Sequence, residues 1–183
     1  RKKTGKVKNV VFVKNQSNEA LVYAVLQLLL KNVDEKLLNS ISNNFKMVGR
    51  FDVRVIGGRT VVFDMAHTKN SVQFLLRNLE KRFPGKKFLF LVSIMKNKNV
   101  RDILLPICEI GQKIVVTSSN LERGYTAKQL EGLAMKTNCK VVAIEDFQVA
   151  YKKLIKKMGV NNILVVTGSH FLVGKVLSGL FRL

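Results

Sequence analysis

The sequence predicts an α/β fold: a Rossmann-like, mostly parallel sheet with one antiparallel hairpin strand and helices on both faces. Three observations indicate this class. Short apolar segments alternate with longer amphipathic segments from Lys69 onward, as in consecutive β-α-β units. The short segments are apolar at nearly every position, which is typical of strands covered on both faces. Gly57 and Gly58 separate two further strand-like segments, and paired glycines favour a tight hairpin turn.

The start of the chain has a different organisation. It predicts one strand and two helices with almost no sheet of their own, and Asp34 is the expected N-cap of the second helix. These elements are expected at residues 10–13, 19–31 and 34–45. They look like the end of a preceding domain. We therefore expect one domain to end at residue 48 and a second to cover residues 49–183.

The elements of the second domain follow from the alternating pattern. The two hairpin strands are expected at residues 51–56 and 59–64. Helices are expected where apolar residues recur every three or four positions, at 69–82, 99–110, 126–137, 146–158 and 170–182. The remaining strands are expected between them, at 87–92, 113–117, 140–144 and 162–167.

The composition is that of a globular protein with an unusually basic surface. Of 183 residues, 47% are hydrophobic, and 32 Lys and Arg against 12 Asp and Glu give a net charge of +20. The lysines are scattered over nearly every polar segment, without a glycine/arginine-rich tail or an aromatic-interleaved strand. This favours a solvated, lysine-rich surface over a nucleic-acid footprint. Such a surface would still attract ATP and other polyanions.

The cysteines and the hydropathy pattern point to the interior of the cell. Cys108 and Cys139 have neither C-x-x-C spacing nor nearby histidines, so we expect unpaired thiols in a reducing compartment and no metal bound through sulfur. There is no signal-type apolar segment behind a charged start and no uninterrupted apolar run long enough to cross a bilayer. A cytoplasmic protein without a membrane partner is expected.

Polar segments follow the predicted strands. In an open parallel sheet, ligands bind outside the carboxyl ends of the strands, so these segments are the first place to look for a site. They are "DMAHT" (64–68), "SIMKNKN" (93–99), "TSSNLERG" (117–124), "EDF" (145–147) and "TGSHF" (167–171). Helix capping alone explains Asn99, Thr126, Glu145 and Asp146.

Asp64, His67 and Ser169 have two interpretations each. Asp64 and His67 end an apolar strand, where they either cap a helix and satisfy local hydrogen bonds or bind a ligand. Ser169 follows Gly168, and its hydroxyl with the helix amides behind it can hold a carboxylate or a phosphate. The sequence contains no P-loop motif and no Ser/His/Asp nucleophile motif, so it assigns no catalytic residue and no metal ligand.

Four motifs resemble the carboxyl-terminal region of the folylpolyglutamate synthase/dihydrofolate synthase family, within the Mur ligase superfamily. "VGRFDV" (48–53) is similar to a P-G-R segment that precedes a hairpin, "DMAHT" to "DGAHN", and "GSHFLVG" (168–174) to "GS-x-x-LVG". Upstream, "NQSNEAL" (15–21) is similar to "HQ-x-x-N-A-A-L". The four motifs occur in the family's order and span essentially the whole chain.

The resemblance implies a function. The family uses ATP and Mg²⁺ to phosphorylate a folate or dihydropteroate carboxylate, and the amine of L-glutamate then attacks the acyl phosphate. The P-loop and most metal ligands of such an enzyme belong to an amino-terminal ATPase domain, of which residues 1–48 would be the end. Matched by motif, Asn18, Arg50 and Asp64 would contact ATP, and His67 and Ser169 would contact glutamate. All five would position substrates.

The sequence also departs from the family pattern. Met65 and Thr68 replace the Gly and Asn of "DGAHN", and "SIMKNKN" lacks the acidic residue of the family's "DKD". Altered substrate preference is therefore an open alternative, as are another Mur-type amino-acid ligase and a basic, non-catalytic nucleic-acid-binding module. Because the P-loop is missing, we expect the 183-residue chain alone to be inactive.

Overall fold

A computed structural model describes residue 25, residues 47–119 and residues 122–180. From Met47 onward the chain forms one compact unit. The strand and the two helices predicted before this point, and the site candidate Asn18, lie outside the described residues. No helix within the described ranges is long and apolar enough to cross a membrane.

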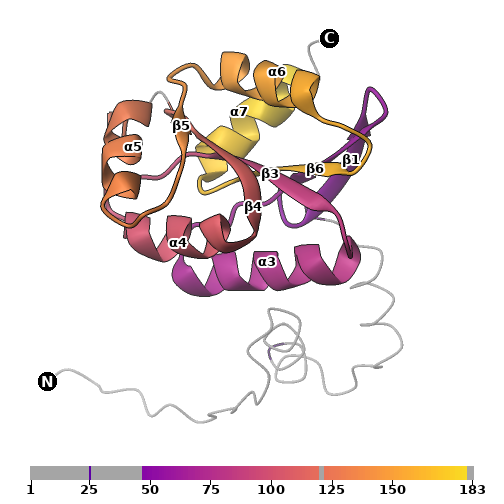
Figure 1. Cartoon of the computed structure of the whole chain (residues 1–183), viewed down its shortest axis with the longest axis horizontal. Coiled ribbons are helices and arrows are strands. Elements are labelled where there is room, and N and C mark those ends of the chain that lie inside the picture. Colours follow the sequence, from indigo (N-terminus) through magenta and orange to yellow (C-terminus); the bar gives the residue numbers. More distant parts are fainter. Residues whose placement is uncertain (1–24, 26–46, 120–121, 181–183) are drawn as a thin grey trace, which may run out of the picture. The chain divides into compact units, whose positions relative to one another are not determined.

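The unit is built on a six-stranded sheet with the order β1-β2-β6-β3-β4-β5 (Figure 1). β1 and β2 pair antiparallel, and all other neighbours pair parallel. The strands are β1 (Asp52–Ile56), β2 (Arg59–Phe63), β3 (Lys87–Val92), β4 (Gly111–Val116), β5 (Val142–Ala143) and β6 (Asn162–Thr167). The predicted fold class is confirmed, including its single antiparallel pair.

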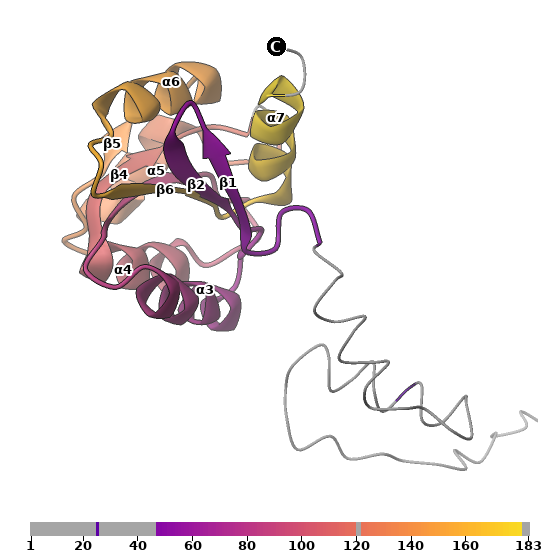
Figure 2. The same ribbon diagram turned by 90° about the vertical axis from the view of Figure 1, so that its right-hand side faces the viewer.

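Helices cover both faces of the sheet. They are α3 (Lys69–Arg82), α4 (Val100–Ile110), α5 (Ala127–Met135), α6 (Phe147–Lys157) and α7 (His170–Leu180). Figure 2 shows α3 and α4 below the sheet and α6 and α7 above it, and α5 packs into the same core as α3 and α4.

The strand residues divide between these two cores by simple alternation. In β3, Phe88 and Phe90 face the helices α3 to α5, whereas Leu89 and Leu91 face α6 and α7. Successive side chains of a strand point to opposite faces, so a strand between two helical layers must be apolar at every position. This requirement explains the continuous apolar runs in the sequence.

The hairpin and the helix starts have local causes. Gly57 and Gly58 have φ values of +54° and +73°, the two positive values that a type I′ turn needs. Thr68 and Thr126 begin α3 and α5 with capping boxes, and Asp146 begins α6 by accepting the amides of the following turn. β5 is shorter than predicted and pairs with β4 through two residues, Val142 and Ala143.

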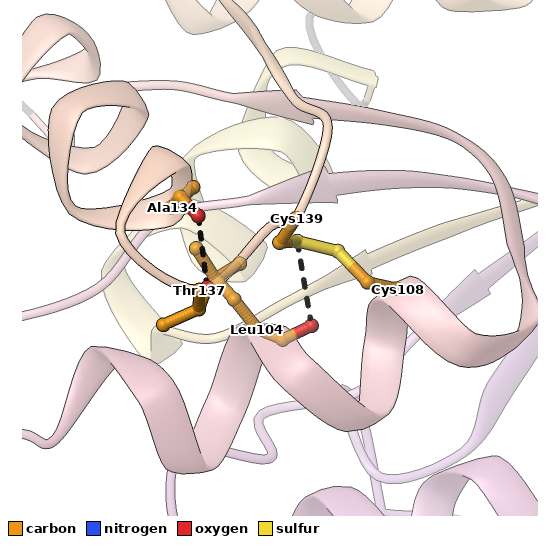
Figure 3. Close-up of a disulfide and its surroundings, with 5 residues drawn as sticks. All are labelled: Leu104, Cys108, Ala134, Thr137 and Cys139. Carbon is orange, nitrogen blue, oxygen red and sulfur yellow. Dashed lines mark hydrogen bonds between the residues drawn. A yellow bond between two sulfur atoms is a disulfide. The ribbon is translucent and has the colours of Figure 1, made fainter.

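The cysteines are paired, so the expectation of free thiols was wrong. Cys108, in the last turn of α4, forms a disulfide with Cys139, which follows α5 (Figure 3). Their Cα atoms lie 5.8 Å apart, although the residues are separated by 31 positions in sequence. The reason is the packing of α4 against α5, which the sequence spacing of the two cysteines does not reveal.

Candidate functional site

The carboxyl ends of the central strands meet at one edge of the sheet. β2, β6, β3 and β4 are parallel neighbours, so the segments that leave them emerge side by side. Backbone hydrogen bonds join these segments: the amide of Asp64 donates to Val166, and the amide of Ser93 donates to Thr167. We call this edge the carboxyl rim. It brings together polar segments that are about a hundred residues apart in sequence.

Buried hydroxyl groups line the rim from below. Within the described part of the chain, every fully buried polar side chain is a serine or threonine at or just after the end of β3, β4 or β6. They are Ser93, Thr117, Ser118, Ser119, Thr167 and Ser169. Hydroxyls carry no charge, so they can be buried at lower cost than a charged group, and at little cost where they find a hydrogen-bond partner. The hydroxyl of Ser93 has no hydrogen-bond partner, which leaves one buried donor unused at the rim.

Asp64 joins two loops of the rim. Its Oδ2 accepts the amide of Phe51 at 2.8 Å, and its Oδ1 accepts the amide of Ala66 at 2.8 Å. Burial raises the pKa of Asp64, and these two hydrogen bonds and the charge of Arg50 act in the opposite direction. The carboxylate therefore fixes the loop that carries Arg50 against the loop that carries His67.

The side chain of Met65 packs against the core, whereas its backbone belongs to the rim. Its amide donates to the carbonyl of Gly49 at 2.9 Å, and its side chain packs with the core beneath α6 and α7. A Cβ on Gly49 would lie 3.0 Å from Cε of Met65 and 3.2 Å from Cγ1 of Val173. Gly49 has a φ of +75°. The methionine that replaces the family's glycine thus packs over Gly49, and Thr68 caps α3.

His67 is held by its own backbone segment. Its Nδ1 lies 2.8 Å from the carbonyl oxygen of Met65. A carbonyl only accepts, so Nδ1 carries the proton and Nε2 is directed elsewhere. Its amide donates to the hydroxyl of Ser71, which also belongs to the capping box of α3. The imidazole is half-buried and fixed in orientation.

Gly168 and Ser169 enter the rim from β6. The amide of Gly168 donates to the carbonyl of Ala66 at 3.0 Å, which ties this segment to the one that carries His67. A Cβ on Gly168 would lie 2.5 Å from the carbonyl oxygen of Ser93, and its φ is +91°. Ser169 is 1% exposed, and its Oγ accepts the amide of Phe171 at 3.2 Å.

His170 is the rim residue that the sequence analysis did not single out. Its ring meets the ring of His67 edge to face, with centroids 4.6 Å apart. Burial lowers the pKa of His170, and the nearby charges of His67, Lys98 and Arg50 lower it further. The feature of the sequence that could have identified His170 is its position directly after Ser169 in "TGSHF". Its contact with His67 depends on the pairing of β2 with β6, which sequence does not show.

The other predicted site residues divide as follows. Arg50 is exposed at the rim, and its charge acts on both Asp64 and His170. Asn18 lies outside the described residues. Across residues 47–119 and 122–180, no three His, Cys, Asp or Glu side chains gather in a way that could hold a metal ion.

A separate hollow of about 420 Å³ lies at the opposite edge of the sheet. It is formed by the hairpin turn, the start of β3 and the start of β6, and it includes Arg59, Lys86 and Asn162. The ammonium of Lys86 donates to the carbonyl of Val160 at 3.3 Å. None of the predicted site residues lines this hollow.

Residues 49–170 match the family model described as "Mur ligase, glutamate ligase domain". Among curated relatives, a dihydrofolate synthase/folylpolyglutamate synthase of Buchnera aphidicola is 22% identical over 141 residues, covering 77% of this chain and 32% of the relative. A UDP-N-acetylmuramoyl-L-alanyl-D-glutamate–2,6-diaminopimelate ligase of Phocaeicola vulgatus is 27% identical over 171 residues, covering 87% of this chain and 35% of the relative. The chain thus spans about a third of the length of these relatives.

Solved structures share the fold. Escherichia coli FolC in complex with ADP superposes with a TM-score of 0.80 at 20% identity, covering 94% of this chain and 41% of that one. The folylpolyglutamate synthase of Thermotoga maritima gives a TM-score of 0.69 at 29% identity, covering 90% and 38%. A bifunctional folylpolyglutamate synthase/dihydrofolate synthase solved with Mn, AMPPNP and L-glutamate gives 0.78 at 20%, covering 88% and 38%.

Proposed function

Because the chain belongs to the Mur ligase family through its glutamate ligase domain, we propose that it is the carboxyl-terminal part of an ATP-dependent ligase that adds L-glutamate to folate. The parent activity is that of a folylpolyglutamate synthase, with dihydropteroate as the acceptor if the enzyme is also a dihydrofolate synthase. The proposal rests on the family, on the relatives of that name and on the residues gathered at the carboxyl rim.

One observation carries the proposal. The loop with Arg50, the loop with Asp64 and His67, and the segment with Ser169 come from three separate places in sequence, yet hydrogen bonds tie them together at one edge. The amide of Phe51, in the first loop, donates to Asp64 in the second. The amide of Gly168, in the third segment, donates to the carbonyl of Ala66 in the second loop. Side chains that match the family motifs therefore lie together at one edge of the sheet. Capping alone does not require this arrangement.

We assign the two halves of the rim to different substrates. On one side, Arg50 approaches the nucleotide, since a guanidinium can spread its hydrogen bonds over several phosphoryl oxygens. Asp64 holds the Arg50 loop in place through Phe51. On the other side, Nε2 of His67 and the hydroxyl of Ser169 orient the incoming amino acid. Their contribution is to place its amine near the activated carboxylate, which removes much of the entropic barrier to attack.

ATP supplies the activation of the acceptor carboxylate in this scheme, and the P-loop that binds it belongs to another part of the protein. Residues 1–48 are proposed to be the end of the ATPase domain, and residues 49–183 the glutamate ligase domain. The sequence of 183 residues contains no P-loop motif. The isolated chain should therefore fold without ligating glutamate.

The test is a substrate panel with the full-length protein. Formation of ADP is measured with each acceptor and each amino acid in turn, and the isolated 183-residue chain serves as the matched negative. Folate- and glutamate-dependent ADP formation by the full-length protein alone is the expected result. Ligation by the isolated chain would refute its assignment as an incomplete enzyme, and an absence of glutamate-dependent turnover in the full-length protein would refute the activity.

A second candidate is a Mur-type ligase that adds an amino acid to a nucleotide-linked peptide. The 27% identity to the diaminopimelate-adding ligase of Phocaeicola vulgatus favours it. The two candidates differ in their acceptor, so the same panel separates them. Turnover with a UDP-N-acetylmuramoyl peptide and none with folate would establish the second candidate.

A further inference from the structure

Four nitrogen-bearing side chains lie at the carboxyl rim. His67 follows β2, Lys98 follows β3, His170 begins α7, and Arg50 precedes β1. The imidazoles of His67 and His170 are in contact at 4.6 Å, and the charges of Lys98 and Arg50 act on His170. The rim therefore combines two cationic side chains, Lys98 and Arg50, with two imidazoles that can donate hydrogen bonds.

This positive charge has little internal compensation. Within the described ranges, none of the four side chains forms an ion pair; the pair that the structure contains joins Arg54 to Asp52. Asp64, the acidic group on which the charge of Arg50 acts, already accepts two backbone amides with its two oxygens. An uncompensated group of cationic side chains stabilises an anion that binds among them.

The four side chains are also accessible. His170 and Arg50 are exposed, and His67 and Lys98 are half-buried. Nδ1 of His67 is already used by Met65, so its Nε2 is the nitrogen available to a ligand. Among the described residues, no hydrogen bond occupies either ring nitrogen of His170, and the guanidinium of Arg123 lies 5.2 Å from the ring centroid of the next residue, Phe171. A ligand can therefore reach His170 from solvent.

We propose that His170 binds the side-chain carboxylate of the incoming amino acid and so selects for an amino acid that carries a second carboxylate. The proposal rests on the proposed function, because His67 and Ser169 are the residues assigned there to the amino acid. The ring of His170 contacts the ring of His67, and His170 directly follows Ser169 in sequence. A group that hydrogen-bonds one feature of a substrate discriminates strongly against the analogue that lacks it.

A phosphate group would bind by the same oxyanion chemistry, so the test must separate the two sources. The 183-residue chain contains only two histidines, and the imidazole Cε1 protons can therefore be followed individually by NMR. His170→Gln assigns the two signals. The chain is titrated with L-glutamate, with L-glutamine as the isosteric probe that lacks the second carboxylate, and with inorganic phosphate.

Saturable binding of L-glutamate at His170, with L-glutamine at least about tenfold weaker, is the expected result. In His170→Gln, binding is followed through the His67 signal, and the ratio of the affinity for L-glutamate to that for L-glutamine should fall towards one. His170→Lys should restore most of this ratio. Lys86→Gln removes one positive charge at the opposite edge and should keep the wild-type selectivity, which controls for net charge. Equal binding of glutamate and glutamine, no binding by any probe, or a stronger response of His170 to phosphate than to glutamate would overturn the proposal.

The outcome is separable from that of the proposed function. Selective binding of glutamate with no ligation by the full-length protein would disprove the activity and leave the carboxylate site standing. Ligation by full-length His170→Gln with an unchanged preference for glutamate over glutamine would disprove the role of His170 and leave the activity standing.

Discussion

The amide of Phe51 donates a 2.8 Å hydrogen bond to Oδ2 of Asp64, thirteen residues further along the chain. Phe51 has a φ of +44°, a left-handed conformation that a bulky residue rarely adopts. The hydrogen bond therefore holds the loop before the hairpin in a costly conformation. Asp64 therefore has a structural role in addition to the ATP contact that the family motif implies for it.

Asp64→Asn should lower the free energy of unfolding by about 1 to 3 kcal/mol, because the two amides bind different oxygens of Asp64 and the side-chain NH₂ of an asparagine would face one of these donors. Urea unfolding followed by circular dichroism measures this loss. Asp146→Asn is the matched control, since Asp146 accepts the amides of Gln148 and Val149 through a single oxygen, as an asparagine can. Equal losses in the two variants would contradict the role assigned to Asp64.

Gly168 should tolerate no side chain. Gly168→Ala places a Cβ 2.5 Å from the carbonyl of Ser93 and 2.9 Å from Cγ1 of Val92, at a φ of +91°. We expect a loss of about 3 kcal/mol or more, because both the contact and the backbone conformation are unfavourable. Gly174→Ala, inside α7 with no atom within 4 Å of the new Cβ, should instead stabilise the chain by up to about 1 kcal/mol. A Gly168→Ala variant as stable as Gly174→Ala would contradict the packing of the rim.

The stability of the chain should depend on pH through His170. Its pKa is lowered in the folded state by burial and by the charges of His67, Lys98 and Arg50, so the unfolded chain takes up the proton first. The stability that neutral His170 contributes is present above its ordinary value of 6.5 and is lost as the pH falls through the lower folded value. Asp64 acts in the opposite sense at lower pH: its raised pKa means that its contribution is present below 3.8 and lost as the pH rises through the folded value.

Urea unfolding at a series of pH values measures the His170 effect. Between about pH 7.5 and 5.5, the free energy of unfolding should fall more in the wild type than in His170→Gln. Lys86→Gln, a change at the opposite edge of the sheet, should follow the wild type. Identical pH profiles for the wild type and His170→Gln would show that the surroundings of His170 do not disfavour its protonated form.

The disulfide should stabilise the packing of α4 against α5. Because Cys108 and Cys139 are 31 residues apart, loss of the cross-link should cost about 3 to 4 kcal/mol on chain-entropy grounds. Thermal unfolding with and without a reductant measures this loss, and Cys108→Ser should be insensitive to the reductant. Alkylation of both cysteines in the native, unreduced chain would instead support the free thiols expected from sequence.

Local patterns predicted most of the fold. Continuous apolar strands, the Gly57–Gly58 turn and the Thr126 cap depend on residues close in sequence, and the structure contains each of them. The disulfide was missed because it depends on helix packing across 31 residues. β5 was overestimated because an edge strand can end wherever pairing with its one neighbour ends, and its pairing with β4 covers two residues.

The candidate site was predicted in part for the same reason. The motifs identified Arg50, Asp64, His67 and Ser169, but the contact between His67 and His170 requires β2 to lie beside β6. Met65 departs from the family pattern because it replaces a glycine. In the structure its side chain packs over Gly49 and towards the core, and the carbonyl of Met65 orients His67.

The central claim is that the carboxyl rim positions the incoming amino acid. The most direct measurement is the KM for L-glutamate and the KM for ATP in the full-length ligase, compared between the wild type and His67→Gln. The account predicts an increase of about tenfold or more in the KM for L-glutamate, the equivalent of one lost hydrogen bond to a charged group, with the KM for ATP nearly unchanged. An unchanged KM for L-glutamate, or equal increases for both substrates, would contradict it.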